Sequence, residues 1–173
     1  MQDIYSDRSY GQDKVGFGER LGILVVDFQK AFTDGRFPMG GSDRVDRAVE
    51  NTARLLTVAR ERNIPVASCF VAYPNVASMP YWKVGAIKET LFEGSEAAEL
   101  DPRIADHDYD YVFQKEGASA VDAFQFGFRT MLVDDCSGDH DEGPHQDTMR
   151  DVGRRYADVV QSDDVINFMM RNS

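Results

Sequence analysis

The sequence is poor in the features that mark several large classes of protein. It has two cysteines, Cys69 and Cys136, which are too few for a disulfide framework, so we expect free thiols in a reducing compartment. No apolar run approaches the roughly 18 residues that a membrane span requires. The first residues lack the basic start and apolar middle of a signal peptide. We therefore expect a cytoplasmic protein that has no membrane partner.

Positive charge is also scarce. The chain has 19 Lys and Arg against 30 Asp and Glu, which gives a net charge of −11. Nucleic acid needs a basic face, so we expect no nucleic-acid partner. The charge says little about small ligands, because net charge mainly governs solubility. The length of 173 residues, with 42% hydrophobic residues, fits a single globular domain.

Short apolar runs alternate with helical patterns along the chain. The runs predict strands at residues 21–28, 65–71, 109–114, 129–133 and 157–160. The helical patterns predict helices at residues 43–62, capped by Ser42 or Asp43, at 119–126, closed by Gly127, at 144–156, and at a last segment capped by Ser162. The first run is continuous, which suits a strand buried on both faces. The alternation predicts an α/β fold with a mostly parallel sheet wrapped by helices.

Two segments lie outside this alternation. Residues 1–20 are polar and turn-rich, so we interpret them as an N-terminal arm over a domain at residues 21–173. Residues 72–108 are irregular, with one helical turn expected near residues 86–91. A loop of this length often covers a site. Its Tyr81 and Trp82 could line a pocket, although a lid packed on the domain explains them equally well.

Charged residues follow three of the expected strands: Asp27, Lys115 and the pair Asp134 and Asp135. Ligands of open α/β sheets bind beyond the carboxyl ends of the strands. A buried Asp is costly unless it is paired, and a nearby Lys would hold it ionised. Such a pair can serve as general base and electrostatic stabiliser. The alternative is that these charges only mark where strands leave the core, but their convergence favours a site.

Other chemical signals are weaker. His140 and His145 have no third His and no Cys at ligand spacing, so we expect no metal. Cys69 lies inside the second expected strand, which favours a buried structural role. Cys136 follows two acidic residues whose charges oppose thiolate formation, so it is a poor candidate nucleophile.

Several longer motifs are spread over nearly the whole chain. They are GFGER at 16–20, LVVDFQKAFTD at 24–34, MPYWK at 79–83, FQK at 113–115, SAVDAFQFGFR at 119–129, EGPH at 142–145 and YADVV at 156–160. Together they resemble the isochorismatase-like cysteine hydrolases, within them most closely the N-carbamoylsarcosine amidase and maleamate amidohydrolase branch. The resemblance implies a three-layer α/β/α fold of Rossmann-like topology.

The resemblance also implies a chemistry. The family hydrolyses a C–N bond of small linear amide or ureido compounds through a cysteine thioester and releases ammonia, without a cofactor. Asp27 matches the family Asp, which takes the thiol proton, and Lys115 matches the Lys that assists the thiolate and the charge developing on the substrate. As candidates for the substrate pocket we take Phe28, Phe32, Tyr81 and Trp82. Relatives of this kind are usually oligomeric, so we expect a homo-oligomer, either a dimer or a tetramer. The other expected partner is its substrate, a small amide.

The sequence departs from the family after Lys115. In the family a helix, a central strand and a Thr-x-x-Cys-Val-Arg-type turn follow this Lys, whereas here Ser119 comes four residues later. About thirty residues, one β–α unit, are therefore absent, in a pattern that an internal deletion would leave. Neither cysteine aligns with the nucleophile, and the oxyanion donors should be gone. The sheet must then close differently, exchange strands with a second chain, or be less stable.

Two further interpretations stay open at this point. Losing a triad nucleophile can cost on the order of a million-fold in turnover, so the chain could be an inactive relative that binds a small acid or pairs with an active homologue. Alternatively, Asp27, Asp134, Asp135 and Lys115 could form a phosphate-handling pocket. A receiver-type domain, however, would carry its acidic pair on the first strand and its Lys on the last.

Overall fold

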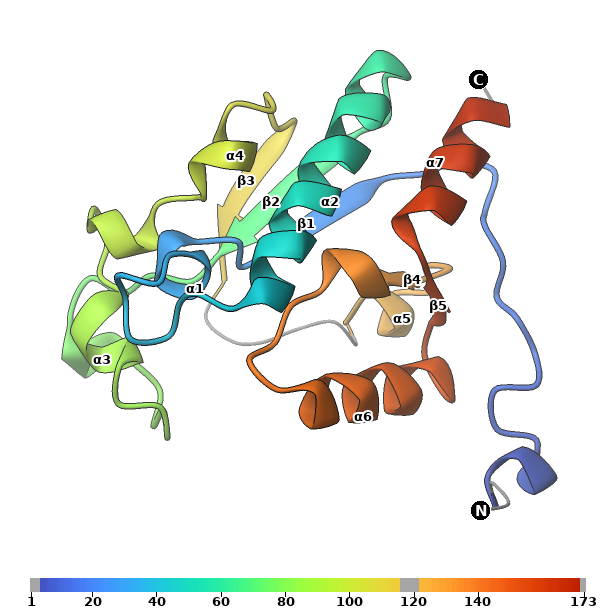
Figure 1. The fold of residues 1–173 in the computed structure, drawn as a ribbon, viewed down its shortest axis with the longest axis horizontal. Coiled ribbons are helices and arrows are strands. Elements are labelled where there is room, and N and C mark those ends of the chain that lie inside the picture. The colour runs from blue at the N-terminus through green and yellow to red at the C-terminus, as the bar shows by residue number, and fades with distance from the viewer. Residues whose placement is uncertain (1–3, 116–121, 172–173) are drawn as a thin grey trace.

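A computed structural model describes residues 4–115 and 122–171 (Figure 1). The strands are β1 (Ile23–Val26), β2 (Val66–Phe70), β3 (Tyr111–Gln114), β4 (Met131–Val133) and β5 (Asp158–Val160). The α-helices are α1 (Lys30–Thr33), α2 (Asp43–Glu61), α3 (Ile87–Thr90), α4 (Pro102–Ala105), α5 (Asp122–Gln125), α6 (Glu142–Gly153) and α7 (Ser162–Arg171). Short 3-10 turns are η1 (Ser6–Arg8), η2 (Val76–Ser78), η3 (Glu96–Ala98) and η4 (Asp134–Cys136). Each predicted strand is present, although it is shorter than expected.

Helix α2 forms where the sequence predicts it. The Ser42 hydroxyl accepts a hydrogen bond from the Val45 backbone N–H at 3.1 Å, which caps the helix start. The buried face of α2 carries Val49, Leu55 and Leu56. These side chains form one core cluster with apolar side chains of β1, β2, α4 and α7. Burial of this face, rather than helix propensity alone, stabilises the helix.

The strands form two separate parallel sheets. One has the order β1-β2-β3, and the other pairs β4 with β5. Cys69 of β2 lies beside Val26 of β1 and Phe113 of β3 in register. The predicted α/β fold with a mostly parallel sheet is therefore confirmed. A sheet in two pieces, with no pairing between β1 and β4 in the described residues, agrees with a chain one β–α unit short.

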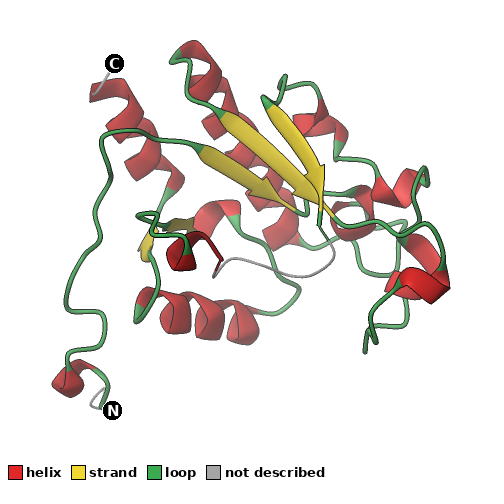
Figure 2. Cartoon of the chain, turned by 180° about the vertical axis from the view of Figure 1, so that it is seen from behind, coloured by secondary structure: helices red, strands yellow, loops and turns green. Residues whose placement is uncertain are grey.

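The helices cover the three-stranded sheet unevenly. In Figure 1, α2 and α7 lie on one side of the strands. Figure 2 shows the other side, where α5 and α6 lie beside β4 and β5 and no helix crosses β1–β3 among the described residues. The prediction that the first strand is buried on both faces is accordingly wrong, because Leu24 is 50% exposed. An apolar run reports the tendency of its residues to be buried, but it does not guarantee a covering layer.

Two other expectations can be compared directly with the structure. Gly127, with φ 81°, follows α5 and ends that helix as predicted, while the first residues of the predicted helix at 119–126 lie outside the described residues. The Ser162 prediction is wrong, because α7 begins at Ser162 itself. The Ser162 hydroxyl instead donates a hydrogen bond to Asp135 at 2.6 Å and accepts one from the Arg54 guanidinium at 2.7 Å.

Residues 72–108 are more ordered than the irregular sequence suggested. The predicted helical turn is confirmed as α3, and η2, η3 and α4 lie in the same segment. Tyr73, Ile87 and Leu91 from this segment are buried in a second core cluster together with Ala31 of α1. The segment thus packs on the carboxyl end of the sheet.

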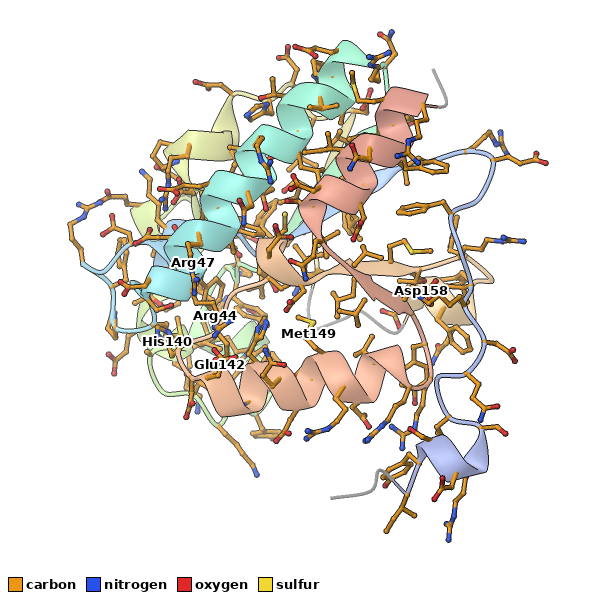
Figure 3. All side chains as sticks on the ribbon, turned by 45° about the vertical axis from the view of Figure 1, so that its right-hand side comes forward. Arg44, Arg47, His140, Glu142, Met149 and Asp158 are labelled. Atoms are coloured by element: carbon orange, nitrogen blue, oxygen red, sulfur yellow. The ribbon has the colours of Figure 1, made fainter. Side chains whose placement is uncertain are left out.

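The two ends of the molecule are tied to the rest by side chains. In the arm, the Gly16 N–H donates to Asp158 at 2.9 Å and Phe17 stacks on Phe168. At the opposite end Arg44 of α2 forms an ion pair with Glu142 of α6, and Figure 3 shows these two side chains close together.

None of the helices in the described part of the chain is both long and apolar enough to cross a membrane.

Candidate active site

Asp27 is the residue at which the chain leaves β1. Its backbone has φ 59°, a left-handed conformation that residues other than glycine seldom adopt. Its N–H still donates to the Cys69 carbonyl at 3.0 Å. Two residues later, the fully buried Gln29 side chain both donates to and accepts from the Val71 backbone at 2.8 Å. These bonds fix the turn that carries Asp27 against the end of β2.

Lys115 reaches the same place from β3. Its backbone N–H donates to the Phe70 carbonyl at 2.8 Å. Its ammonium nitrogen Nζ lies 2.7 Å from Oδ2 of Asp27, within charge-assisted hydrogen-bond distance. The structure thus brings together two residues that are 88 positions apart, as the rule for parallel strand ends predicts.

The Asp27 carboxyl has an unusual environment. Burial raises its pKa above the ordinary value, and the hydrogen bond and positive charge of Lys115 offset this only in part. Its other oxygen, Oδ1, is buried and has no hydrogen-bond partner in the described structure. A raised pKa makes a carboxylate a better proton acceptor, and an unpaired buried oxygen can accept a proton or a hydrogen bond from a ligand.

Cys69 is a neighbour of this pair that sequence reasoning did not associate with it. Burial and the charge of Asp27 raise the pKa of the Cys69 thiol, while Lys115 acts in the opposite direction. The predicted burial of Cys69 is confirmed, since it is 2% exposed. Strand register could have indicated this position of Cys69. In a parallel sheet, a residue just before the end of the middle strand lies beside the ends of both neighbouring strands.

Cys136 lies in η4, after the other sheet. Burial raises the pKa of its thiol to about 11, and the charge of Asp135 adds to this, while the charge of Arg54 opposes it. The prediction that this thiol resists ionisation agrees with that direction. Burial, however, is a larger cause than the acidic neighbours.

The acidic pair after β4 does not join Asp27 and Lys115. Asp134 binds His145 Nε2 at 2.6 Å and accepts from the Gln161 side chain at 3.1 Å. Asp135 accepts from the Ser162 backbone N–H at 2.7 Å at the start of α7. The expected convergence of all four charges is therefore wrong, because β4 belongs to a separate sheet and its end serves local hydrogen bonds.

Neither histidine after β4 is arranged for a metal. His145 is buried in its bond to Asp134, and a ring nitrogen of His140 lies 2.8 Å from the Met39 carbonyl. Within residues 4–115 and 122–171, no three His, Cys, Asp or Glu side chains are grouped as a metal site would need.

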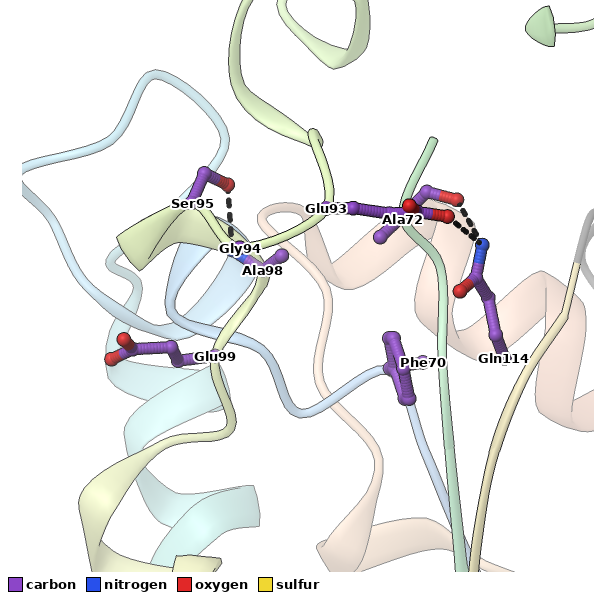
Figure 4. A pocket seen from close by; sticks show the side chains of 8 residues that line it. All are labelled: Phe70, Ala72, Glu93, Gly94, Ser95, Ala98, Glu99 and Gln114. Atoms are coloured by element: carbon purple, nitrogen blue, oxygen red, sulfur yellow. Dashed lines mark hydrogen bonds between the residues drawn. The ribbon is translucent and has the colours of Figure 1, made fainter. Parts of the chain in front are cut away.

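A small cavity opens at the carboxyl ends of β2 and β3 (Figure 4). It has a volume of about 240 Å³ and is lined by Phe70, Ala72, Glu93, Gly94, Ser95, Ala98, Glu99 and Gln114. The Gln114 amide donates to the Ala72 carbonyl at 2.6 Å and to Glu93 at 3.3 Å. Sequence reasoning missed these residues. Gln114 could have been found because it precedes Lys115, whereas Glu93 carried no signal in the sequence.

The four aromatic pocket candidates lie elsewhere. Phe28 packs against the main core, and Phe32 and Trp82 pack against the second core cluster. The Trp82 indole donates to the Tyr73 hydroxyl at 2.9 Å, and Tyr81 is fully exposed. None of the four lines the cavity of Figure 4, so their role in a substrate pocket stays a prediction.

Known proteins resemble this chain in sequence. A maleamate amidohydrolase of Pseudomonas putida is 28% identical over 207 residues, covering 96% of each chain. An N-carbamoylsarcosine amidase of an Arthrobacter species is 24% identical over 205 residues, covering 96% of this chain and 77% of the relative. The first alignment is longer than the 173 residues of this chain, so at least 34 of its positions, 207 minus 173, have no counterpart here. This number fits a missing β–α unit.

Solved structures share the fold. A cysteine hydrolase from Pseudomonas syringae pv. phaseolicola has a TM-score of 0.80 at 13% identity, covering 93% of this chain and 97% of that one. An N-carbamoylsarcosine amidase from Thermoplasma acidophilum has a TM-score of 0.66 at 18% identity, covering 83% and 97%. The family model for the isochorismatase domain matches residues 22–122, more than half of the chain. The protein therefore belongs to the isochorismatase-like hydrolase family.

Proposed function

We propose that the protein hydrolyses a C–N bond of a small linear amide or ureido compound of the maleamate or N-carbamoylsarcosine type and releases ammonia. The observation that carries the proposal is the Asp27–Lys115 pair, 2.7 Å apart at the strand ends. The names of two relatives support the substrate class. The small cavity at the ends of β2 and β3 has room for a compound of that size; Gln114, which precedes Lys115, lines it, whereas Asp27 and Lys115 do not.

Asp27 and Lys115 have different roles in the proposed hydrolysis. The Asp27 carboxylate takes the proton of the attacking group, which its raised pKa favours. The Lys115 ammonium stabilises the negative charge that develops on the substrate carbonyl oxygen. When the tetrahedral intermediate collapses, the C–N bond breaks, and the nitrogen leaves as ammonia after it takes up the proton held by Asp27. Where the attacking group is a thiol, water then cleaves the thioester to the acid.

Cys69 is the thiol to test as the attacking group. It adjoins both charged residues, but its thiol must become exposed and lose its proton against a raised pKa. Cys136 is the matched control, because it is the other cysteine of the chain and has no part in the Asp27–Lys115 site.

The test is release of ammonia from maleamate and from N-carbamoylsarcosine by the purified chain, after its intact mass has been checked against 19.5 kDa. We expect turnover that Asp27→Asn abolishes. If Cys69 attacks, Cys69→Ser also abolishes turnover and Cys136→Ser leaves it unchanged. Absence of ammonia with both compounds would refute hydrolysis of these substrates by this chain.

A second candidate function is binding of a small acid without turnover. It is favoured by the burial and raised pKa of both thiols, which leave the site without a ready nucleophile. Calorimetric titration with maleamate distinguishes the two functions. Binding that Lys115→Met removes, with no ammonia formed, supports the binder, and absence of both heat and ammonia contradicts both proposals.

The cellular setting of this proposal is the cytoplasm, where both cysteines would stay free thiols as they are here. A homo-oligomer, dimer or tetramer, forms part of the same proposal, since a small chain with an incompletely covered sheet gains buried area by assembly.

A further inference from the structure

A second cavity lies between the N-terminal arm, the sheet β4-β5 and helix α7. Its volume is about 540 Å³, more than twice that of the cavity in Figure 4. Figure 1 shows the arm running beside α7 and β5, and Figure 3 shows Asp158 on the side of β5 that faces the arm. Neither Asp27 nor Lys115 lines this cavity, so it is separate from the candidate active site.

The arm forms one wall of the cavity and is held in place at two adjacent residues. The Gly16 N–H donates a hydrogen bond to Asp158 at 2.9 Å. The next residue, Phe17, stacks on Phe168 of α7 with the ring centroids 4.4 Å apart. Gly16, Phe17, Asp158 and Phe168 all line the cavity. The contacts that attach the arm to the domain therefore also shape the cavity.

Helix α7 forms another wall, whose chemical character changes along its length. Asp164, Phe168 and Arg171 all line the cavity. They are spaced four and three residues apart, which places them on one face of the helix. A rise of 1.5 Å per residue separates the first from the last by about 10 Å. An acidic start and a basic end are common in helices, but here both ends, with an aromatic ring between them, line one cavity.

The acidic end of the cavity carries a second carboxylate. Asp158 lies on β5, the strand that leads into α7, and so at the same end as Asp164. One oxygen of Asp158 accepts from Gly16, and one oxygen of Asp164 accepts from the Gln161 N–H at 3.0 Å. The second oxygen of each has no hydrogen-bond partner in the described part of the chain. Lys14, two residues before Gly16, offsets only one of the two negative charges.

The middle and the basic end of the cavity differ from the acidic end. Phe17, Phe168 and Met131 give the middle an apolar, half-buried lining. At the far end, the exposed Arg171 guanidinium forms no ion pair within residues 4–115 and 122–171. This lack of a partner contrasts with the excess of acidic residues that gives the chain a net charge of −11.

We propose that this cavity binds an ω-amino acid, a linear compound with an amine at one end and a carboxylate at the other. The ammonium group lies against Asp158 and Asp164, and the carboxylate lies against Arg171. The apolar chain between them covers the aromatic middle. An extended chain of about eight carbons separates the two charges by about 10 Å. This inference does not depend on the proposed amide chemistry.

Titration of the full chain with 8-aminooctanoate, followed by the NMR shifts of its backbone amides, tests the proposal. The compound is a zwitterion at neutral pH. We expect a Kd of about 1–10 mM, which is ordinary for a ligand of this size. The largest shifts should fall at residues 16–17 and 164–171, which line the cavity.

Two analogues each remove one charge and keep the carbon chain. 8-Acetamidooctanoate has no ammonium group, and 8-aminooctanamide has no carboxylate. Each should bind about threefold more weakly than 8-aminooctanoate, because one exposed charge pair is lost. Equal affinities for the three compounds would overturn the proposal, because they would show that the charged ends of the cavity contribute nothing.

Two variants with the same change in net charge should have opposite effects on binding. Arg171→Gln removes the partner of the ligand carboxylate and should weaken binding of 8-aminooctanoate about threefold. Lys14→Gln removes a cation from the end that holds the ammonium, and should tighten binding about twofold. Lys83→Gln is the matched control, since Lys83 is exposed and does not line the cavity. It should leave the affinity unchanged.

The variants and analogues together locate the charged contacts. Arg171→Gln should not change the affinity for 8-aminooctanamide, which has no carboxylate to lose a partner. Effects of the same sign in Arg171→Gln and Lys14→Gln would show a response to net charge alone and would overturn the proposal. Absence of shifts at residues 16–17 and 164–171 with about 50 mM ligand would also overturn it.

Discussion

The two sheets end in carboxylates that differ in how their oxygens are used. After β4, both oxygens of Asp134 and both of Asp135 accept hydrogen bonds from the chain itself. After β1, Asp27 has one oxygen paired with Lys115, while the other is buried and has no hydrogen-bond partner in the part of the chain that the structure describes. A carboxylate whose acceptors are all occupied maintains structure, whereas one with a free acceptor can act on a ligand. Under the proposed function, the carboxylate after the first sheet carries the chemistry, and the carboxylates after the second sheet stabilise the fold.

The largest effect should come from removing the positive charge beside Asp27. We expect Lys115→Met to slow ammonia release about a thousandfold, because the developing oxyanion and the Asp27 carboxylate both lose their cation. Lys30→Met is the matched control, since Lys30 pairs with Glu99 rather than with Asp27. It should change the rate less than about threefold. Equal losses in the two variants would contradict the assignment.

The next largest effect concerns the two thiols. With its pKa at about 11, Cys136 should react with iodoacetamide at pH 8 about a hundredfold more slowly than in the unfolded chain. Because the charge of Asp27 raises the pKa of Cys69, Asp27→Asn should speed alkylation of Cys69 and leave Cys136 unchanged. Peptide mass mapping over time measures both rates. Equal acceleration at the two sites would show general loosening instead.

A smaller effect should appear in stability. Asp135→Ala removes the acceptors for the Ser162 backbone N–H and hydroxyl at the start of α7. We expect a loss of about 1–2 kcal/mol in the free energy of unfolding, measured with urea. Asp163→Ala, in the same turn, breaks only an exposed ion pair with Arg54 and should cost less than about 0.5 kcal/mol. A loss in Asp163→Ala as large as in Asp135→Ala would contradict this account.

The smallest expected effect concerns how the free energy of unfolding depends on pH. Asp134 and Asp27 should change it in opposite directions. Burial raises the pKa of Asp134, but hydrogen bonds from Gln161 and His145 outweigh it and hold the pKa below 3.8. Its stabilising contribution is therefore present above pH 3.8 and lost as pH falls further. The pKa of Asp27 is raised, so its contribution is full below pH 3.8 and is lost as pH rises through the folded-state pKa.

Urea unfolding of the wild type, Asp27→Asn and Asp134→Asn at a series of acid pH values measures both dependences. The wild type should lose the Asp134 contribution in acid and Asp134→Asn should not. Asp27→Asn should abolish a fall in stability that begins above pH 3.8. Slopes of the same sign for the two carboxylates would refute the contrast between the sheets.

The sequence predicted the parts of the fold that depend on local pattern. The period of apolar residues and the cap at Ser42 were enough for α2, and the rule that parallel strands end at one edge was enough to place Asp27 near Lys115. The same rule failed for Asp134, because a sequence does not show that its strand belongs to a different sheet. The residue pattern predicts which residue follows the end of a strand. The pairing of the strands determines which other residues lie beside it.

The exposure of Leu24 on one face of the sheet β1-β2-β3 could not be predicted from the sequence pattern for a similar reason. Leu24 lies in an apolar run that reads the same whether or not a second helical layer covers it. The motif comparison indicated that a unit was absent, yet it could not say which surface that absence would expose. The cavity residue Glu93 was equally hidden, because its position depends on how residues 72–108 fold back over the strand ends.

We propose that Asp27, and not the acidic pair after β4, is the reacting carboxylate. Side-by-side ammonia release from maleamate by the wild type, Asp27→Asn and Asp134→Asn tests it most directly, with folding checked by circular dichroism. We predict turnover in the wild type and in Asp134→Asn, and a loss of at least about a hundredfold in Asp27→Asn. Full activity in folded Asp27→Asn would contradict the claim.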